Sequence, residues 1–179
     1  MVDMDASSTS LTQNSSPIPP SPSYSSSSII TNYPLISAIV AFIIAQACKF
    51  LLIWYTERRW DAKQLVGSGG MPSSHSSTVT ALAIAIGIQD GFGGPLFATA
   101  MILACVVMCD ASGVRLHAGR QAEVLNQIVY ELPAEHPLAD TRPLRELLGH
   151  TPPQVIAGSF VGCVIAVIGN FIRKATAQT

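Results

Sequence analysis

The sequence predicts an all-α protein: a polytopic membrane helix bundle of about four transmembrane helices plus an amphipathic helical loop. Three observations favour this class. Apolar residues make up 49% of the 179 residues and charged residues only 12%. The mean hydropathy is +0.40, which is high for a soluble domain. The apolar residues also gather in long runs, and a single long polar segment interrupts them.

The chain divides into three parts. Residues 1–32 are rich in Ser and Pro and should form a disordered tail, because they cannot bury enough apolar surface to offset the entropy of ordering. Residues 33–173 should form the membrane bundle, and residues 174–179 a short polar C-terminus. The tail has neither the basic start and apolar stretch of a secretory signal nor the Arg content of a transit peptide. Its Ser content leaves a plastid open beside the endomembranes as the location.

The first expected span is Pro34 to Tyr55, an apolar run of 22 residues. At about 1.5 Å per residue it can cross a hydrocarbon core of roughly 30 Å. Three shorter runs follow at Thr78–Gln89, Pro95–Cys109 and Val155–Ile172. The second and third reach spanning length only with polar flanks, so buried helices of a soluble bundle are the alternative. The glycines from Gly91 to Gly94 predict a tight turn and an antiparallel hairpin.

Residues 110–150 form the long polar segment. Within it, Gln121–Leu132 places apolar residues on one face at helical spacing, which predicts an amphipathic helix on the membrane or against the bundle. Asp140 and Thr141 precede Pro143 and predict the start of another helix, which Gly149 should end.

Basic residues set the expected orientation. They follow the first span and recur in the polar segment before the fourth, so four crossings would place both loops on one side, which the positive-inside rule makes cytoplasmic. Gly158 and Gly162 form a small-xxx-small step in the last run that permits close helix packing. Small residues in the other spans allow such packing within or between subunits, so an oligomer is compatible with the sequence.

The most unusual stretch runs from Gly69 to Ser77, where a membrane helix is expected to start. Helix N-termini favour anions, because free amides and the helix dipole point there. The hydroxyls of Ser73 and Ser74 can donate to phosphate oxygens, and His75 can protonate a leaving oxygen, since a histidine pKa of about 6.5 suits acid–base work. The alternative is that Ser73 or Ser74 caps the helix and His75 only occupies its first turn.

A second histidine, His150, opens the last apolar helix on the same predicted side. Two imidazoles at one membrane face permit a division of labour, in which one attacks phosphorus and the other supplies a proton to the leaving group. In-line displacement would then require the two rings to lie roughly 5 to 8 Å apart. Taken alone, His150 is equally well read as a capping or interfacial residue.

At these residues the sequence resembles the type 2 phosphatidic acid phosphatase superfamily, which also includes vanadium-dependent haloperoxidases. Its middle motif, Pro-Ser-Gly-His, is matched by Pro72-Ser73-Ser74-His75 with one Gly-to-Ser change. Its last motif is matched by His150–Gly158 except at Gln154. With Asp110–Arg115 and Gln121–Asn126, the resemblance is closest to a compact, divergent branch and covers roughly residues 35–172.

The resemblance implies a role for each matching residue. His75 would be the general acid and His150 the nucleophile that forms a phospho-histidine intermediate. Ser73 and Ser74, with nearby amides, would hold the phosphate. The candidates for the basic residues that stabilise the transition state are Lys63, Arg115 and Arg145.

Gln154 departs from the family pattern, which has an Asp that accepts a hydrogen bond from the nucleophilic histidine. A carboxylate orients the imidazole and stabilises its positive form, whereas glutamine orients it without a charge. The loss could amount to several orders of magnitude in rate. Asp110 or Glu123 could fold in to replace the missing carboxylate.

The leading expectation is a membrane phosphatase that hydrolyses a lipid phosphomonoester or diphosphate without a metal or other cofactor. The alternative is a non-catalytic membrane protein that keeps the fold and binds phosphate or a lipid headgroup. A haloperoxidase is disfavoured, since nothing indicates a halide or peroxide site. The four cysteines are not spaced as metal ligands. The expected partners are the lipid bilayer and a phosphorylated lipid, and no nucleic acid, because a net charge of −1 offers no basic surface.

Overall fold

A computed structural model describes residues 29–57, 70–139 and 141–178, and within these ranges it contains helices and no strands. The prediction of an all-α bundle is confirmed. The predicted disordered tail, apart from its last four residues, lies outside the described residues, and so does Lys63. In chain order the elements are η1 (Ile29–Thr31), α1 (Tyr33–Glu57), α2 (Ser74–Asp90), α3 (Pro95–Ser112), α4 (Val114–Tyr130) and α5 (Pro152–Thr176).

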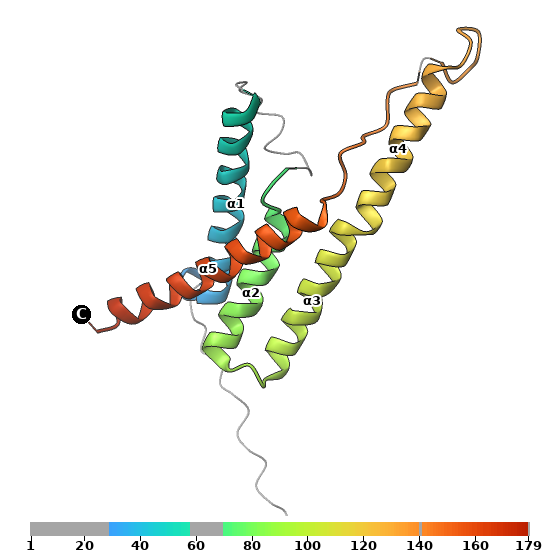
Figure 1. Cartoon of the computed structure of the whole chain (residues 1–179). Coiled ribbons are helices and arrows are strands. Elements are labelled where there is room, and N and C mark those ends of the chain that lie inside the picture. The colour runs from blue at the N-terminus through green and yellow to red at the C-terminus, as the bar shows by residue number, and fades with distance from the viewer. Residues whose placement is uncertain (1–28, 58–69, 140, 179) are drawn as a thin grey trace, which may run out of the picture.

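Helix α2 is the centre of the bundle, because α1, α3 and α5 all pack against it (Figure 1). It ends at Asp90, where Gly91 takes a φ of +95°. That left-handed backbone conformation favours glycine. Helix α3 then starts with Pro95 in its first turn, so the predicted antiparallel hairpin is confirmed.

Small residues form the contacts between the helices. In α1 the buried positions recur every four residues, and in α5 they follow the same spacing. The large apolar side chains, such as Phe42, Ile102 and Phe160, are instead exposed. A bilayer stabilises this arrangement, because lipid covers the outer side chains while small residues let the helices approach closely. The buried stripes are Ser37, Ala41, Ala45 and Lys49 in α1, and Gly158, Gly162, Ala166 and Asn170 in α5.

Among the described residues, three helical segments are long and apolar enough to cross a membrane: Tyr33–Thr56, Pro95–Tyr130 and Pro152–Thr176. The second expected span, Thr78–Gln89, corresponds to α2, which has 17 residues and is therefore about 26 Å long. That length is slightly below a hydrocarbon core of roughly 30 Å. Helix α2 is thus an inner helix that the longer helices surround.

Helices α3 and α4 follow each other with only Gly113 between them and form one long rod (Figure 1). The expected amphipathic helix at Gln121–Leu132 is confirmed as part of α4, but it begins seven residues earlier, at Val114. At the junction the Gly113 amide still donates to the Cys109 carbonyl. This hydrogen bond continues the direction of α3 into α4.

The prediction of a helix between Asp140 and Gly149 is wrong. Asp140 lies outside the described residues, and residues 141–149 return along α4 without helical structure (Figure 1). The side chain of Asn126 replaces the missing backbone bonds, since it accepts from the Leu144 amide at 2.7 Å and donates to the Leu144 carbonyl at 2.8 Å. The backbones also approach closely, because a Cβ at Gly119 would overlap the Glu146 carbonyl oxygen.

Candidate functional site

The N-terminal ends of α2 and α5 lie side by side. A Cβ added at Gly158 would overlap the Ser73 carbonyl oxygen, and one at Gly162 would overlap the Ser77 carbonyl oxygen. In addition, the Ser73 amide donates to the Gln154 carbonyl at 3.1 Å. The predicted close packing through Gly158 and Gly162 is therefore confirmed, and it brings the two histidine motifs together.

His75 and His150 meet at this junction. Their ring centroids are 5.9 Å apart and the planes are inclined by 58°, a separation within the expected range. His150 is 3% exposed, and its amide donates to the Ala111 carbonyl at 2.9 Å. His75 is half-buried in the first turn of α2. Nδ1 of His75 and Nε2 of His150 are buried without a hydrogen-bond partner, although buried polar atoms normally have one.

Gln154 sets the tautomer of His150. Its Oε1 accepts from the Thr151 amide at 3.0 Å and lies 3.3 Å from Nδ1 of His150. Since a backbone N–H can only donate, the atom facing Thr151 must be the amide oxygen, and Nδ1 must carry the proton that this oxygen accepts. Nε2 of His150 is then left with a lone pair. The same glutamine closes the capping box of α5.

Burial lowers the pKa of His150 below the usual value for histidine, because desolvation disfavours the imidazolium. The hydrogen bond to Gln154 opposes this shift, whereas the electrostatic effects of His75 and Lys49 reinforce it. The Gly70 backbone also opposes it, as the smallest of these effects. His150 is therefore neutral at physiological pH.

We expect acid to destabilise the protein through His150. Because its folded pKa lies below the unfolded value of about 6.5, the unfolded chain binds the proton first as the pH falls. The stabilisation is complete above about pH 6.5 and is lost as the pH drops from there through the folded pKa. The thermal-unfolding midpoint in detergent should fall between about pH 7.5 and 5.5, and fall less in His150→Gln. An equal fall in both proteins would contradict this assignment, and His136→Gln in the exposed loop is the control.

Ser73 serves chiefly as a helix cap. Its side chain is fully buried. The hydroxyl oxygen accepts hydrogen bonds from the Ser76 amide at 3.3 Å and from the Ser76 hydroxyl at 3.0 Å. Its amide is already bonded to Gln154. The capping alternative from the sequence is thus realised at Ser73. Ser74, also buried, and His75 occupy the first turn, where helix amides have no carbonyl partner within the helix.

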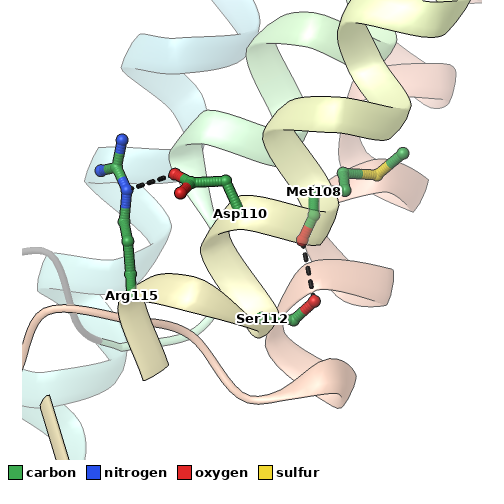
Figure 2. Close-up of polar contacts among 4 residues, drawn as sticks. All are labelled: Met108, Asp110, Ser112 and Arg115. Atoms are coloured by element: carbon green, nitrogen blue, oxygen red, sulfur yellow. Dashed lines mark hydrogen bonds and ion pairs between the residues drawn. The ribbon is translucent and has the colours of Figure 1, made fainter. Parts of the chain in front are cut away.

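The predicted basic residues are not all brought to the histidines. Arg115, at the start of α4, reaches back to Asp110 and forms an ion pair of 2.5 Å (Figure 2). Both charges act electrostatically on His75. Asp110 therefore pairs with Arg115, while the residue that contacts the His150 ring is Gln154 itself. Arg145 is exposed in the segment that returns along α4.

Lys49 is a further candidate site residue that the motifs did not reveal. It is 2% exposed at the end of the small-residue stripe of α1, and its charge acts on both His75 and His150. Its methylene groups pack against Gly70, just ahead of the middle motif. The signal was present in the sequence, because an ionisable residue inside an apolar span is by default a functional candidate.

The outward apolar surface and the paired histidine motifs together define a membrane phosphatase-like protein. The chain belongs to the divergent PAP2 family, whose model matches residues 30–165. It is also 37% identical over 150 residues to the uncharacterized membrane protein YuiD of Bacillus subtilis (strain 168), an alignment that covers 78% of this chain and 95% of YuiD. No solved structure matches the chain.

Proposed function

We propose that the protein is a metal-independent membrane phosphatase that hydrolyses a lipid phosphomonoester or diphosphate through a phospho-histidine at His150. The observation that carries this proposal is the pair of imidazoles with centroids 5.9 Å apart, each with one buried ring nitrogen that lacks a partner. A phosphoryl group between the rings would place its phosphorus opposite the lone pair on Nε2 of His150 and an oxygen within reach of Nδ1 of His75. The lone pair on Nε2 of His150, fixed by Gln154, is the nucleophile that such a reaction needs.

In the first step Nε2 of His150 attacks phosphorus, and the bond between phosphorus and the lipid oxygen breaks. A protonated His75 gives its proton to that oxygen, so the dephosphorylated lipid leaves as a neutral hydroxyl, or as a monophosphate when the substrate is a diphosphate. In the second step neutral His75 takes a proton from water, and the water oxygen attacks the phospho-histidine. Inorganic phosphate leaves, and both imidazoles return to their initial states.

Lys49 and Arg115 are the cations proposed to stabilise the phosphoryl group. Lys49 lies on the inner side of the site and its charge reaches both histidines. Arg115 lies at the outer side, held by Asp110 (Figure 2). Fixed positive charges stabilise the charge that spreads over the phosphoryl oxygens in the transition state. Ser74 and the first-turn amides of α2 lie at the positive end of the helix dipole, which also favours a bound anion.

The test is an assay of the full chain, purified in detergent, with phosphatidate, a prenyl diphosphate and phosphatidylglycerophosphate. We expect release of inorganic phosphate from at least one of them in the presence of a metal chelator. A phosphoenzyme that is labile in acid and stable in alkali should be trapped by rapid quenching. Release that disappears with the chelator, or that proceeds without such an intermediate, would contradict the proposal.

The second candidate is a non-catalytic protein that binds a phosphate headgroup without turnover. Gln154 favours it, because the amide orients His150 but cannot stabilise its positive form by charge. The two candidates share the same site and differ in whether the phosphoryl group is transferred.

Gln154→Glu should raise phosphate release by about tenfold or more, since it adds the missing charge on an isosteric side chain. The carboxylate can still accept from Thr151 and from Nδ1 of His150, and it should raise the pKa of His150. Phosphate release and the titration of His150 by nuclear magnetic resonance are the two measurements. Gln121→Glu on the exposed face of α4 makes the same charge change away from the site. A raised pKa without faster release would support the non-catalytic candidate.

A further inference from the structure

A cavity lies between α1 and α5, away from the histidines. It has a volume of about 640 Å³, within the usual range for a small-molecule site. Its walls are mainly branched aliphatic side chains, among them Val40, Ile44 and Ile168, and Arg173 and Tyr33 also line it. Both helices are candidate membrane spans. A hydrocarbon chain therefore matches the walls.

Arg173 gives this cavity a positive charge. Its guanidinium carbon lies 4.7 Å from the centre of the Tyr33 ring, a cation–π contact that holds the charge beside the cavity. Its other partners are neutral, since Nη1 is 3.4 Å from Oε1 of Gln89 and Nη2 is 3.3 Å from Oδ1 of Asn170. Among the described residues no carboxylate forms an ion pair with Arg173. Lys174 follows it in the last turn of α5.

The cavity is separate from the proposed phosphatase site. Gln89, which contacts Arg173, is 14 residues beyond His75 in the same helix. At about 1.5 Å per residue His75 and Gln89 are roughly 21 Å apart along the helix. A headgroup at Arg173 cannot reach the histidines, so a lipid bound here is not the molecule being hydrolysed.

We propose that the cavity between α1 and α5 binds an anionic phospholipid, with an acyl chain against its aliphatic walls and the phosphate on Arg173. A guanidinium can bind two phosphate oxygens in a bidentate manner. An apolar groove that ends in a cation without a carboxylate partner matches a molecule with a long tail and a negative head. This lipid would bridge α1 and α5 at the face opposite to the histidines.

The experiment is native mass spectrometry of the full chain in detergent, titrated with phosphatidylglycerol or phosphatidylcholine of the same acyl chains. We expect one phosphatidylglycerol to bind at least about fivefold more tightly. Arg173→Gln should remove this preference, whereas Lys174→Gln, with the same loss of charge beside the cavity, should keep it. Phosphatidylglycerol is a diester, so its binding does not depend on phosphatase activity.

A second pair of variants tests the tail. Val40→Trp should fill the cavity and weaken the binding of both lipids, whereas Val106→Trp on the exposed face of α3 should not. Thermal unfolding without lipid identifies any variant that fails to fold, and Ile44→Trp then takes its place. Equal affinities for the two lipids in the wild type, or unchanged binding in a folded variant with a filled cavity, would overturn the proposal.

Discussion

His150→Ala is expected to abolish the release of phosphate from lipid substrates, with a loss of at least about a thousandfold. The substitution removes Nε2, the proposed nucleophile, which has no hydrogen-bond partner while Nδ1 faces Gln154. His75→Ala should act differently, since it removes a proton donor and leaves the nucleophile. With p-nitrophenyl phosphate, whose leaving group needs no proton, His75→Ala should still form the phosphoenzyme. Rapid-quench trapping with both substrates separates the two roles.

The matched control for both variants is His136→Ala, in the exposed loop after α4. It should release phosphate at the wild-type rate. Phosphate release that survives His150→Ala would remove His150 as the nucleophile. Loss of the phosphoenzyme from p-nitrophenyl phosphate in a folded His75→Ala protein would assign His75 a role in binding or attack rather than in protonation.

Gly158→Leu should prevent the bundle from folding. Even a Cβ at this position would overlap the Ser73 carbonyl oxygen, and backbone cannot yield as a flexible side chain can. Helix α5 would have to move away from α2, which breaks the bond from the Ser73 amide to Gln154 and separates the histidines. Gly158→Ala should still fold but lose about 1 to 3 kcal/mol, the usual cost of overpacking. Size-exclusion profiles and thermal unfolding in detergent measure both effects.

Gly93→Leu is the control for this pair, because a Cβ at Gly93 meets no atom within 4 Å and Gly93 does not have a positive φ. It should behave as the wild type does. A Gly158→Leu protein with a wild-type elution profile and unfolding midpoint would show that α2 and α5 do not touch here. The proposed site would then lose its geometric basis.

The proximity of His75 and His150 could be predicted because both stand in short motifs at helix starts. Pro72–His75 and His150–Gly158 each indicate the beginning of a membrane helix. Two helices that begin on the same side of the membrane and pack together bring these N-terminal ends close to each other. Lys49 could not be placed in the same way, because it stands alone in an apolar run and its neighbours come from other helices. The stripe of small residues in α1 indicates which face of the helix is buried, and Lys49 lies on that face.

The error between residues 140 and 149 has a different cause. Pro143 and the leucines after it fit a helix by local rules, but the Asn126 side chain, 18 residues away in the sequence, takes the Leu144 backbone bonds. Long-range hydrogen bonds of this kind leave no local pattern. In α4, by contrast, apolar residues recur at helical spacing, so the helix could be predicted from local pattern. Its start at Val114 could not, because the residues that follow α3 are polar.

The α3–α4 rod has a consequence for access to the site. The segment Pro95–Tyr130 has 36 residues and is therefore about 54 Å long, whereas a hydrocarbon core is roughly 30 Å thick. If Pro95 marks one boundary, Ala111, whose carbonyl holds the His150 amide, is about 24 Å along the rod. The imidazoles would then sit near the depth of the opposite glycerol and phosphate layer. A lipid could present its phosphate by sideways diffusion, without being lifted out of the leaflet.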